Sequence, residues 1–375
     1  MSVDGLKLED EMRINVNALT IDEPVSDPRA IAFCEHFLSG GVPRYVFGCN
    51  AWGKSIADAI HIDGFVDDFS NDELFCGRKV IRSCDLPVNA FVVSAVVLGR
   101  PLTALAKMNE IGVAVIDYFS FKKYSGLPLR VVDYFHGCAE DIFSNRERYD
   151  SVFSRLSDHE SRHVFSKIIN FRVSEDIHWM SGFSDEQYRQ YFENFLCLNR
   201  SGEVFIDVGS YDGSTAKEFI ARCENYKAVH VFEPILSNME RVRKKLSSYD
   251  RVSYYECAAS DKEGVICFTS DGASSMCCDE GDMKVKGARI DELINEPCTF
   301  IKMDVEGSEV AAIRGASKTI LDHHPRLAIS VYHRADDFWR IPDVVFAIRD
   351  DYDLFLRHYT EGVVETVMFF MPRVS

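Results

Sequence analysis

The sequence predicts an α/β protein with two sheets joined by a helical segment. Short apolar runs alternate with amphipathic stretches in residues 43–121, and the same alternation returns from Glu203 to the end of the chain. Because buried parallel strands are continuously apolar, both patterns favour parallel sheets covered by helices. At about 150 residues per domain the length suggests two domains, and the pattern places the boundaries at 1–138, 139–200 and 201–375.

Composition and charge exclude several classes of protein. Apolar residues make up 46% of the chain and charged residues 27%, which excludes wholesale disorder. The net charge of −17 disfavours a nucleic-acid partner. The longest uncharged apolar run, Ala90–Gly99, has the length of a buried strand, not of a membrane span. The N-terminus is acidic and has no apolar stretch, so no signal peptide is expected and the predicted location is cytoplasmic.

The twelve cysteines are scattered and form no C-x-x-C motif. Without a secretory signal we expect reduced thiols, most of them buried as small apolar residues.

In residues 43–121 the apolar and amphipathic runs alternate as they do in a small open α/β sheet. The runs at 45–50, 62–68, 90–99 and 113–119 predict strands, and 55–60 predicts a helix. The turn Gly48–Gly53 and the acidic end Asp67–Asp68 resemble a degenerate half of a Rossmann-like nucleotide-binding domain. Such a module could hold a nucleotide-sugar or serve only in packing, and the sequence leaves both open.

The middle block carries a helical pattern and contains no proline. Tyr188, Phe192, Phe195 and Leu196 follow the i, i+4, i+7, i+8 spacing of one helix face, mostly as core residues. The segment His159–His163 matches the zinc motif H-E-x-x-H, but it carries a cation at Arg162 and no clear third ligand follows. We therefore predict no metal there.

The last block predicts a second parallel sheet. Strands are expected at 204–208, 229–233, 252–258, 265–270, 299–304 and 326–333, and helices at 237–246 and 308–321. Residues 353–359 and 360–371 instead predict two strands joined by a turn at Gly362, an antiparallel pair that ends the sheet.

The strongest motif lies in Val204–Thr215, where an apolar strand ends at Asp207 and a turn contains Gly209 and Gly213. Ligands of such sheets bind outside the carboxyl ends of the strands. The glycine spacing is neither that of dinucleotide-binding proteins nor that of a P-loop. Asp207 suits a cationic amino-acid group, and Glu233, at the end of the next strand, suits a ribose diol. A ribose without phosphate plus an amino acid describes S-adenosylmethionine, the predicted cofactor; the alternative is a turn that binds no cofactor.

A third element, Phe300–Glu309, places Lys302, Asp304 and Glu306 on one face of an extended segment. Asp304 and Glu306 should project into the crevice that holds the cofactor. The motifs DVGSYDG, FEP and IKMDVEGSE, with Gly315–Ala316 and the later LAISVYHRADDFWRIP, resemble the FkbM family of S-adenosylmethionine-dependent methyltransferases. The resemblance extends from about Tyr149 to Phe370. It implies a class I methyltransferase fold, Rossmann-like, with a seven-stranded sheet whose last strand is antiparallel.

The resemblance also implies roles for residues and a reaction, the methylation of hydroxyl oxygens. It implies that Glu233 contacts the ribose and that Asp304 and Glu306 form the floor of the active site. Asp304 is also implied to lie near the cofactor. Tyr211 stands where many members have a small polar residue or Asn, and residues 269–284, which could fold over the substrate, vary too much to be transferred. The remaining cofactor positions are the loop residues Asp207, Gly209, Asp212 and Gly213 and, near the adenine, Ala258 and Ala259.

A hydroxyl acceptor calls for a general base. The candidates are Asp304, Glu306 and His333, of which we prefer His333 because its ordinary pKa is near 6.5; the alternative is a purely structural His333. Lys302 is expected to pair with Glu306 or to stabilise an alkoxide. Tyr188 or Tyr191 could close over the cofactor. The sequence leaves metal dependence through Asp304 and Glu306 open, because no third ligand stands at a convincing position.

The predicted function is an S-adenosylmethionine-dependent O-methyltransferase acting on a sugar, nucleotide-sugar, glycan or small natural product. The alternative is a binding module for S-adenosylmethionine or a nucleotide-sugar that has no activity. An oxidoreductase would need a dinucleotide fingerprint that Gly48–Gly53 does not supply. The sequence leaves the oligomeric state open.

Overall fold

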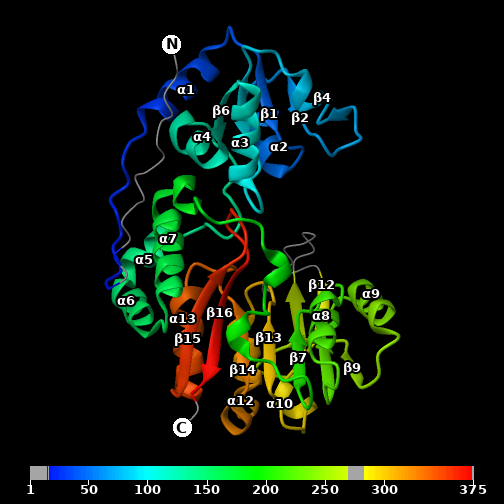
Figure 1. Ribbon diagram of the computed structural model, residues 1–375. Helices are drawn as coiled ribbons and strands as arrows, with labels where there is room; N and C mark the ends of the chain where they lie inside the picture. Colours follow the sequence, from blue (N-terminus) through cyan, green and yellow to red (C-terminus); the bar gives the residue numbers. More distant parts are fainter. Residues whose placement is uncertain (1–14, 16, 269–282, 374–375) are drawn as a thin grey trace.

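The computed structural model describes residues 15, 17–268 and 283–373 (Figure 1). Two sheets stand one above the other in this view, and a group of helices lies beside the lower sheet. Among the described residues, no helix combines the length and apolar character needed to cross a bilayer. The structure agrees with the predicted α/β class, while the domain boundaries at 138 and 200 stay a prediction.

The N-terminal sheet has six strands in the order β3-β4-β2-β1-β5-β6, and only the β3–β4 pair is antiparallel. Its strands are β1 (Arg44–Phe47), β2 (Gly64–Val66), β3 (Leu74–Phe75), β4 (Arg78–Ile81), β5 (Phe91–Ser94) and β6 (Ala114–Asp117). Its helices are α1 (Pro28–Ser39), α2 (Ala51–Ala59), α3 (Pro101–Ile111) and α4 (Tyr118–Ser125).

The N-terminal sheet differs from the prediction in a hairpin and in its helices. The β3–β4 hairpin and the helices α1, α3 and α4 were not expected, and the strand predicted over 113–119 ends at Asp117, just before α4. The start and end signals of α3 are nevertheless present in the sequence, because Pro101 stands in its first turn and Gly112 caps its end in the left-handed region.

The middle block begins with three helices, α5 (Cys138–Ser144), α6 (Arg146–Arg155) and α7 (His159–Ser174), and three short 3₁₀ turns follow at Ile177–Met180, Gln187–Arg189 and Asn194–Leu196. Within the zinc-like motif, His159 is the first residue of α7, whose N-cap is Asp158.

The helix predicted over Tyr188–Leu196 is wrong. Positive φ angles at Tyr191 and Cys197 interrupt the chain between and after the two turns, so its aromatic side chains reach different neighbours. Phe192 packs against Phe300, whereas Phe195 stacks on Phe355. The helix-like spacing therefore reflects burial against several elements and not one helix face.

The C-terminal sheet has seven strands in the order β15-β16-β14-β13-β7-β8-β9. All pairs are parallel except those of β16, which is antiparallel to both of its neighbours. This topology confirms the predicted antiparallel strand. The strands are β7 (Val204–Val208), β8 (Ala228–Phe232), β9 (Val252–Tyr255), β13 (Phe300–Met303), β14 (Arg326–Ser330), β15 (Tyr352–His358) and β16 (Thr366–Pro372). Its helices are α8 (Ser214–Arg222), α9 (Leu236–Leu246), α10 (Ile290–Leu293), α11 (Glu309–Gly315), α12 (Ser317–His323) and α13 (Asp337–Ile348).

A separate three-stranded sheet lies beside the C-terminal sheet. It consists of β10 (Ala258–Ala259), β11 (Gly264–Phe268) and β12 (Met283–Ala288) in the order β10-β12-β11. The run predicted as one strand over 252–258 is therefore divided, since β9 ends at Tyr255. Most of the segment 269–284, and the pair Cys277-Cys278, lie outside the described residues.

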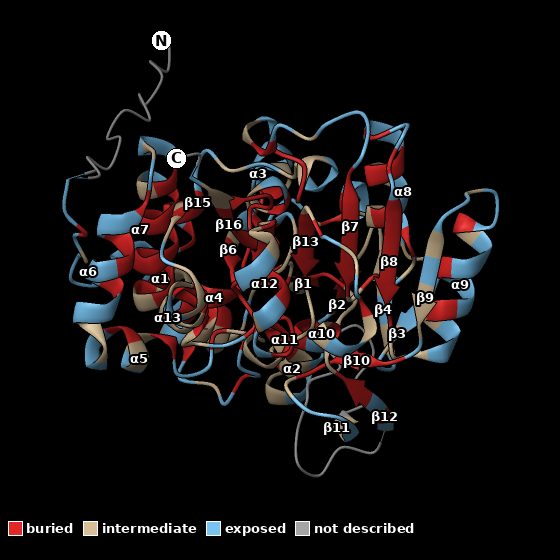
Figure 2. Ribbon diagram, turned by 90° about the horizontal axis from the view of Figure 1, so that it is seen from below, coloured by how far each residue is buried: buried red, intermediate tan, exposed pale blue. Residues whose placement is uncertain are grey.

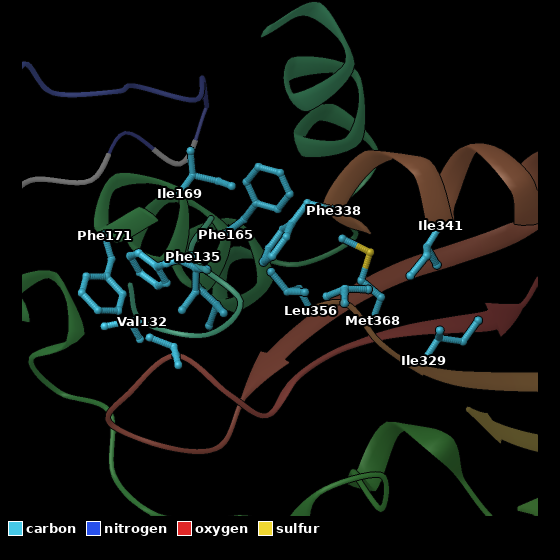
Figure 3. Close-up of a cluster of buried hydrophobic side chains, with 14 of the residues drawn as sticks. Val132, Phe135, Phe165, Ile169, Phe171, Ile329, Phe338, Ile341, Leu356 and Met368 are labelled. Atoms are coloured by element: carbon cyan, nitrogen blue, oxygen red, sulfur yellow. The ribbon is translucent and has the colours of Figure 1, made fainter. Parts of the chain in front are cut away.

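Burial follows the sheets. Figure 2 shows β13, β7 and β8 buried along their lengths. Figure 3 shows one core cluster, in which α7 and α13 pack against β14–β16 through Phe165, Phe338 and Met368. The free thiols are mixed in exposure: Cys34, Cys138, Cys223, Cys257 and Cys298 are buried, whereas Cys76, Cys84 and Cys197 are exposed.

Candidate active site

A cavity of about 770 Å³ lies at the carboxyl ends of the C-terminal strands. Its walls are the loops that follow β7, β8 and β13, the small sheet, and residues near the start of β16. The volume falls within the range of small-molecule and cofactor sites. Gly209, Glu233, Ala258, Ala259, Asp304 and Glu306, all predicted site residues, line it.

The loop after β7 closely approaches the loop after β13. Gly209 has a φ of +77°, and a Cβ atom there would lie 1.8 Å from the carbonyl oxygen of Asp304. Lys302 Nζ donates a hydrogen bond to the carbonyl oxygen of Gly209 at 2.6 Å, which fixes the loop after β7. Only glycine fits this position.

Asp207 does not line the cavity. It is fully buried, and its Oδ1 lies 3.3 Å from Lys302 Nζ while its Oδ2 accepts a hydrogen bond from Ser210 Oγ at 2.8 Å. Lys302 thus pairs with Asp207 and not, as expected, with Glu306. The pair supports the loop from within the protein.

Glu233 closes the other side of the loop. Its Oε2 accepts from the backbone N–H of Tyr211 and its Oε1 from that of Ile235, both at 2.9 Å. Burial raises the pKa of Glu233, and these N–H donors partly offset the effect. Two further predicted cofactor residues stand outside the cavity: Asp212 pairs with Lys245, and Gly213, at a φ of +82°, faces α9.

Past Glu233 the cavity is lined by the small sheet. The apolar part of this lining consists of Ala258, Ala259, Val265, Ile266 and Val285, and Ser260, Asp261 and Lys262 also line the cavity here.

The opposite end of the cavity is lined by carboxylates. Asp304, Glu306 and Glu365 all reach it, and no Lys or Arg is among the described residues that line this end. Burial raises the pKa of Glu306 to about 7, with repulsion from Asp304 adding to the shift and the charge of His333 opposing it. Burial and repulsion from Asp304 likewise raise the pKa of Glu365 to about 7. Burial also acts on Asp304, but the charges of Lys302 and His333 lower its pKa overall.

Hydrogen bonds fix each of these carboxylates. Tyr191 Oη donates to Asp304 Oδ2 at 2.7 Å, and Tyr134 Oη donates to Glu306 Oε2 at 3.1 Å. The Gln190 amide donates to Glu365 Oε2. Of the two tyrosines considered for this site, Tyr191 is buried, whereas Tyr188 is 74% exposed and does not line the cavity.

His333 lies behind the carboxylates and does not line the cavity. Its Nε2 is 3.4 Å from Asp304 Oδ1 and 3.5 Å from Glu306 Oε2, and its Nδ1 is 2.9 Å from Glu309 Oε1. Burial opposes the charged form, but the three carboxylates outweigh it and raise the pKa of His333 to about 10. The imidazole is therefore a cation at neutral pH and has no free lone pair with which to accept a proton.

Asp304, Glu309 and His333 offer ligand atoms within 4.8 Å of one another. The two carboxylates, however, face opposite nitrogens of the ring. In this arrangement the protonated imidazole of His333 lies between the carboxylates of Asp304 and Glu309 and pairs with both.

The cavity fits S-adenosylmethionine. The Glu233 carboxylate would accept hydrogen bonds from a ribose diol, and the alanine and valine side chains of the small sheet would provide apolar contacts for the adenine. With the strand order above, these features define a class I methyltransferase.

Comparisons with known proteins agree. Residues 207–361 match the family described as the methyltransferase FkbM domain. The chain is similar to the 2-O-methyltransferase NoeI of Sinorhizobium fredii (strain NBRC 101917 / NGR234), 25% identical over 149 residues, which are 33% of this chain and 61% of the relative. It thus spans about three fifths of that relative's length. The crystal structure of the methyltransferase FkbM from Methylobacillus flagellatus KT superimposes with a TM-score of 0.72 at 22% identity, covering 92% of this chain and 93% of that one.

The cavity and the family match together identify residues 207–361 as an FkbM-type domain of the S-adenosylmethionine-dependent methyltransferases. The predicted cofactor and fold are confirmed.

Three residues of the carboxylate end had no part in the sequence prediction: Tyr134, Gln190 and Glu365. They lie in loops far from the motifs, so no spacing rule connects them to the site. The only local signal was the position of Glu365 just before the last strand, at the edge where the site lies.

Proposed function

We propose that this protein methylates a hydroxyl oxygen of a neutral sugar or other polyol. The observation that carries the proposal is the half-buried carboxylate of Glu306, which lines the cavity and whose pKa lies near 7. A carboxylate with this pKa can accept a proton from a hydroxyl group at neutral pH. The similarity to a 2-O-methyltransferase supports oxygen as the acceptor atom.

In this reaction each side chain at the carboxylate end has a separate role. When bound, S-adenosylmethionine supplies the methyl group to the acceptor oxygen and leaves as the neutral thioether. Glu306 accepts the hydroxyl proton, and Asp304, held by Tyr191, orients the acceptor. His333 stays protonated and keeps the neighbouring carboxylates in place, so we transfer the role of base from His333 to Glu306.

The charge at this end of the cavity favours a neutral acceptor. Asp304, Glu306 and Glu365 would repel a phosphate, since no cationic side chain lines this end within the described part of the chain. We therefore favour a sugar or polyol over a nucleotide-sugar.

The N-terminal sheet gives a nucleotide-sugar no better site. Helix N-termini bind phosphate through free N–H groups. At α2 these groups are taken by Asn50, whose Oδ1 accepts from the backbone N–H of Trp52 and Gly53, and at α3 the Glu361 carboxylate accepts from the N–H of Thr103. A second cavity, of about 420 Å³, is lined by Asp63, Asp67, Asp72, Glu73 and Asp85, with only Lys79 and Arg82 as cations.

The first experiment tests the cofactor site. Calorimetric titration with S-adenosylmethionine should show binding that Glu233→Gln weakens by about tenfold or more, because one ribose acceptor becomes a donor. Asp212→Asn is the matched control, since Asp212 lies outside the cavity and should leave the affinity within about twofold. Equal loss in both variants would contradict the assigned ribose position.

The second experiment tests the reaction. Transfer of a labelled methyl group should be screened over neutral sugars, their phosphate esters and their amino derivatives. Glu306→Gln should retain cofactor affinity and lose about 10²-fold or more in kcat. Binding without transfer to any hydroxyl compound would favour the alternative, a module that binds S-adenosylmethionine without activity.

A further inference from the structure

The N-terminal sheet meets the C-terminal sheet at the acceptor end of the cavity. Residues 95–103, which follow β5 and enter α3, pack against two segments of the C-terminal half, 183–190 and 359–365. In Figure 1 the tip of the β15–β16 hairpin points up toward the N-terminal sheet. We propose that this contact, called the clamp below, positions the acceptor half of the active site.

The hairpin tip is held by charge, by hydrogen bonds and by close packing. The Glu361 carboxylate accepts from the backbone N–H of Thr103 at 2.7 Å and from its hydroxyl at 2.5 Å. The backbone N–H of Glu361 donates to the carbonyl oxygen of Gly99 at 2.9 Å. A Cβ atom at Gly362 would lie only 1.8 Å from the carbonyl oxygen of Leu98. Glu361 is only 7% exposed, so its hydrogen bonds to Thr103 are shielded from solvent.

The segment 183–190 is bound both to the loop 95–103 and to the hairpin tip. Arg100 Nε donates to Asp185 Oδ2 at 2.7 Å, and the backbone N–H of Glu186 donates to the carbonyl oxygen of Tyr359 at 3.0 Å. The loop of the N-terminal sheet, the 183–190 segment and the hairpin tip therefore form one connected contact.

Both held segments continue directly into the active site. The hairpin tip ends at Glu365, which lines the cavity and whose backbone oxygen accepts from the N–H of Tyr359 at 3.1 Å. The other segment ends at Gln190, which binds Glu365, and leads into Tyr191, which binds Asp304. The cofactor residues lie instead on the loops after β7 and β8 and on the small sheet. The clamp therefore supports the acceptor end and leaves the cofactor end untouched.

This assigns the N-terminal sheet a function in the reaction. Glu361 and Thr103 are positioning residues, because they act on Glu365 through the backbone and do not reach the cavity. The inference rests on the proposed function for its catalytic part, since it concerns the placement of the acceptor.

The test uses two glycines of the clamp in the full chain. Gly362→Ala forces the hairpin tip away from Leu98, whereas Gly99→Ala adds the same methyl group where no atom lies within 4 Å. Thr103→Val is a milder variant that removes only the hydroxyl bond to Glu361, and Thr103→Ser restores it. All four are compared with the wild type by S-adenosylmethionine calorimetry, by amide hydrogen exchange, and by kcat and KM with a hydroxyl acceptor from the screen.

We expect Gly362→Ala and Thr103→Val to keep cofactor affinity within about twofold while kcat falls about tenfold or more, since small misplacements at a reacting centre have large effects. Amide exchange should rise in both 183–191 and 359–366. Gly99→Ala and Thr103→Ser should behave as the wild type. Unchanged exchange in 183–191, or equal loss of cofactor affinity, would overturn the proposal. The exchange comparison needs no acceptor, so it decides the matter even if no hydroxyl compound is methylated, an outcome that would refute the proposed function separately.

Discussion

The buried pair of Lys302 and Asp207 distinguishes two roles for Asp207. From its place at the end of β7 it would contact the cofactor, but in the structure it is fully buried and 3.3 Å from Lys302 Nζ, which is itself only 3% exposed. The Asp207→Asn substitution removes one charge of a desolvated pair. Breaking such a pair costs about 3–5 kcal/mol. Because the new amide can still accept a bond from Ser210, we expect a value near the lower limit, about 3 kcal/mol.

The assay combines urea unfolding with cofactor calorimetry. Asp207→Asn should lower the unfolding free energy by that amount and leave S-adenosylmethionine affinity within about twofold, since Lys302 keeps its 2.6 Å bond to the carbonyl oxygen of Gly209. Lys302→Met is the informative companion, because it removes that bond as well and should reduce both stability and affinity. If Asp207→Asn left stability unchanged and weakened affinity by tenfold or more, Asp207 would contact the cofactor directly and our reasoning would be wrong.

Glu306, His333 and Gly209 each allow a further test of this site. The kcat/KM of the wild type should rise with pH and level off above about 7, falling roughly tenfold per pH unit below, because Glu306 acts as a base only when ionised; a profile that is flat between pH 5 and 8 would exclude it. His333 has its pKa raised from 6.5 to about 10, so its stabilising contribution is fully present below pH 6.5 and is lost as the pH rises through 10. In urea titrations the stability difference between wild type and His333→Gln should shrink over that window, and a constant difference would contradict the ion pairs. Gly209→Ala should abolish cofactor binding by calorimetry, since its Cβ would overlap the Asp304 carbonyl oxygen; retained affinity would show that the two loops can separate.

The class of fold and the strand ends that line the cavity could be predicted from the sequence. Continuous apolar runs ending in Asp207, Glu233 and Asp304 marked strands whose carboxyl ends meet at one edge. Local signals of this kind suffice because strand burial and turn chemistry depend on neighbours in the chain. The cofactor, the antiparallel strand and the cavity positions of Glu233 and Glu306 all followed from them.

The identity and the charge state of the side chains that reach the cavity depend on the tertiary structure. Asp207 turns inward to Lys302, and His333 lies behind the carboxylates as a cation, because each is surrounded by residues distant in sequence. Glu365 belongs to the β15–β16 hairpin, whose tip contacts the N-terminal half through Glu361 and Thr103. A pKa is set by desolvation and by charges within a few ångströms. Those neighbours are fixed by long-range packing, which no local pattern in the sequence encodes.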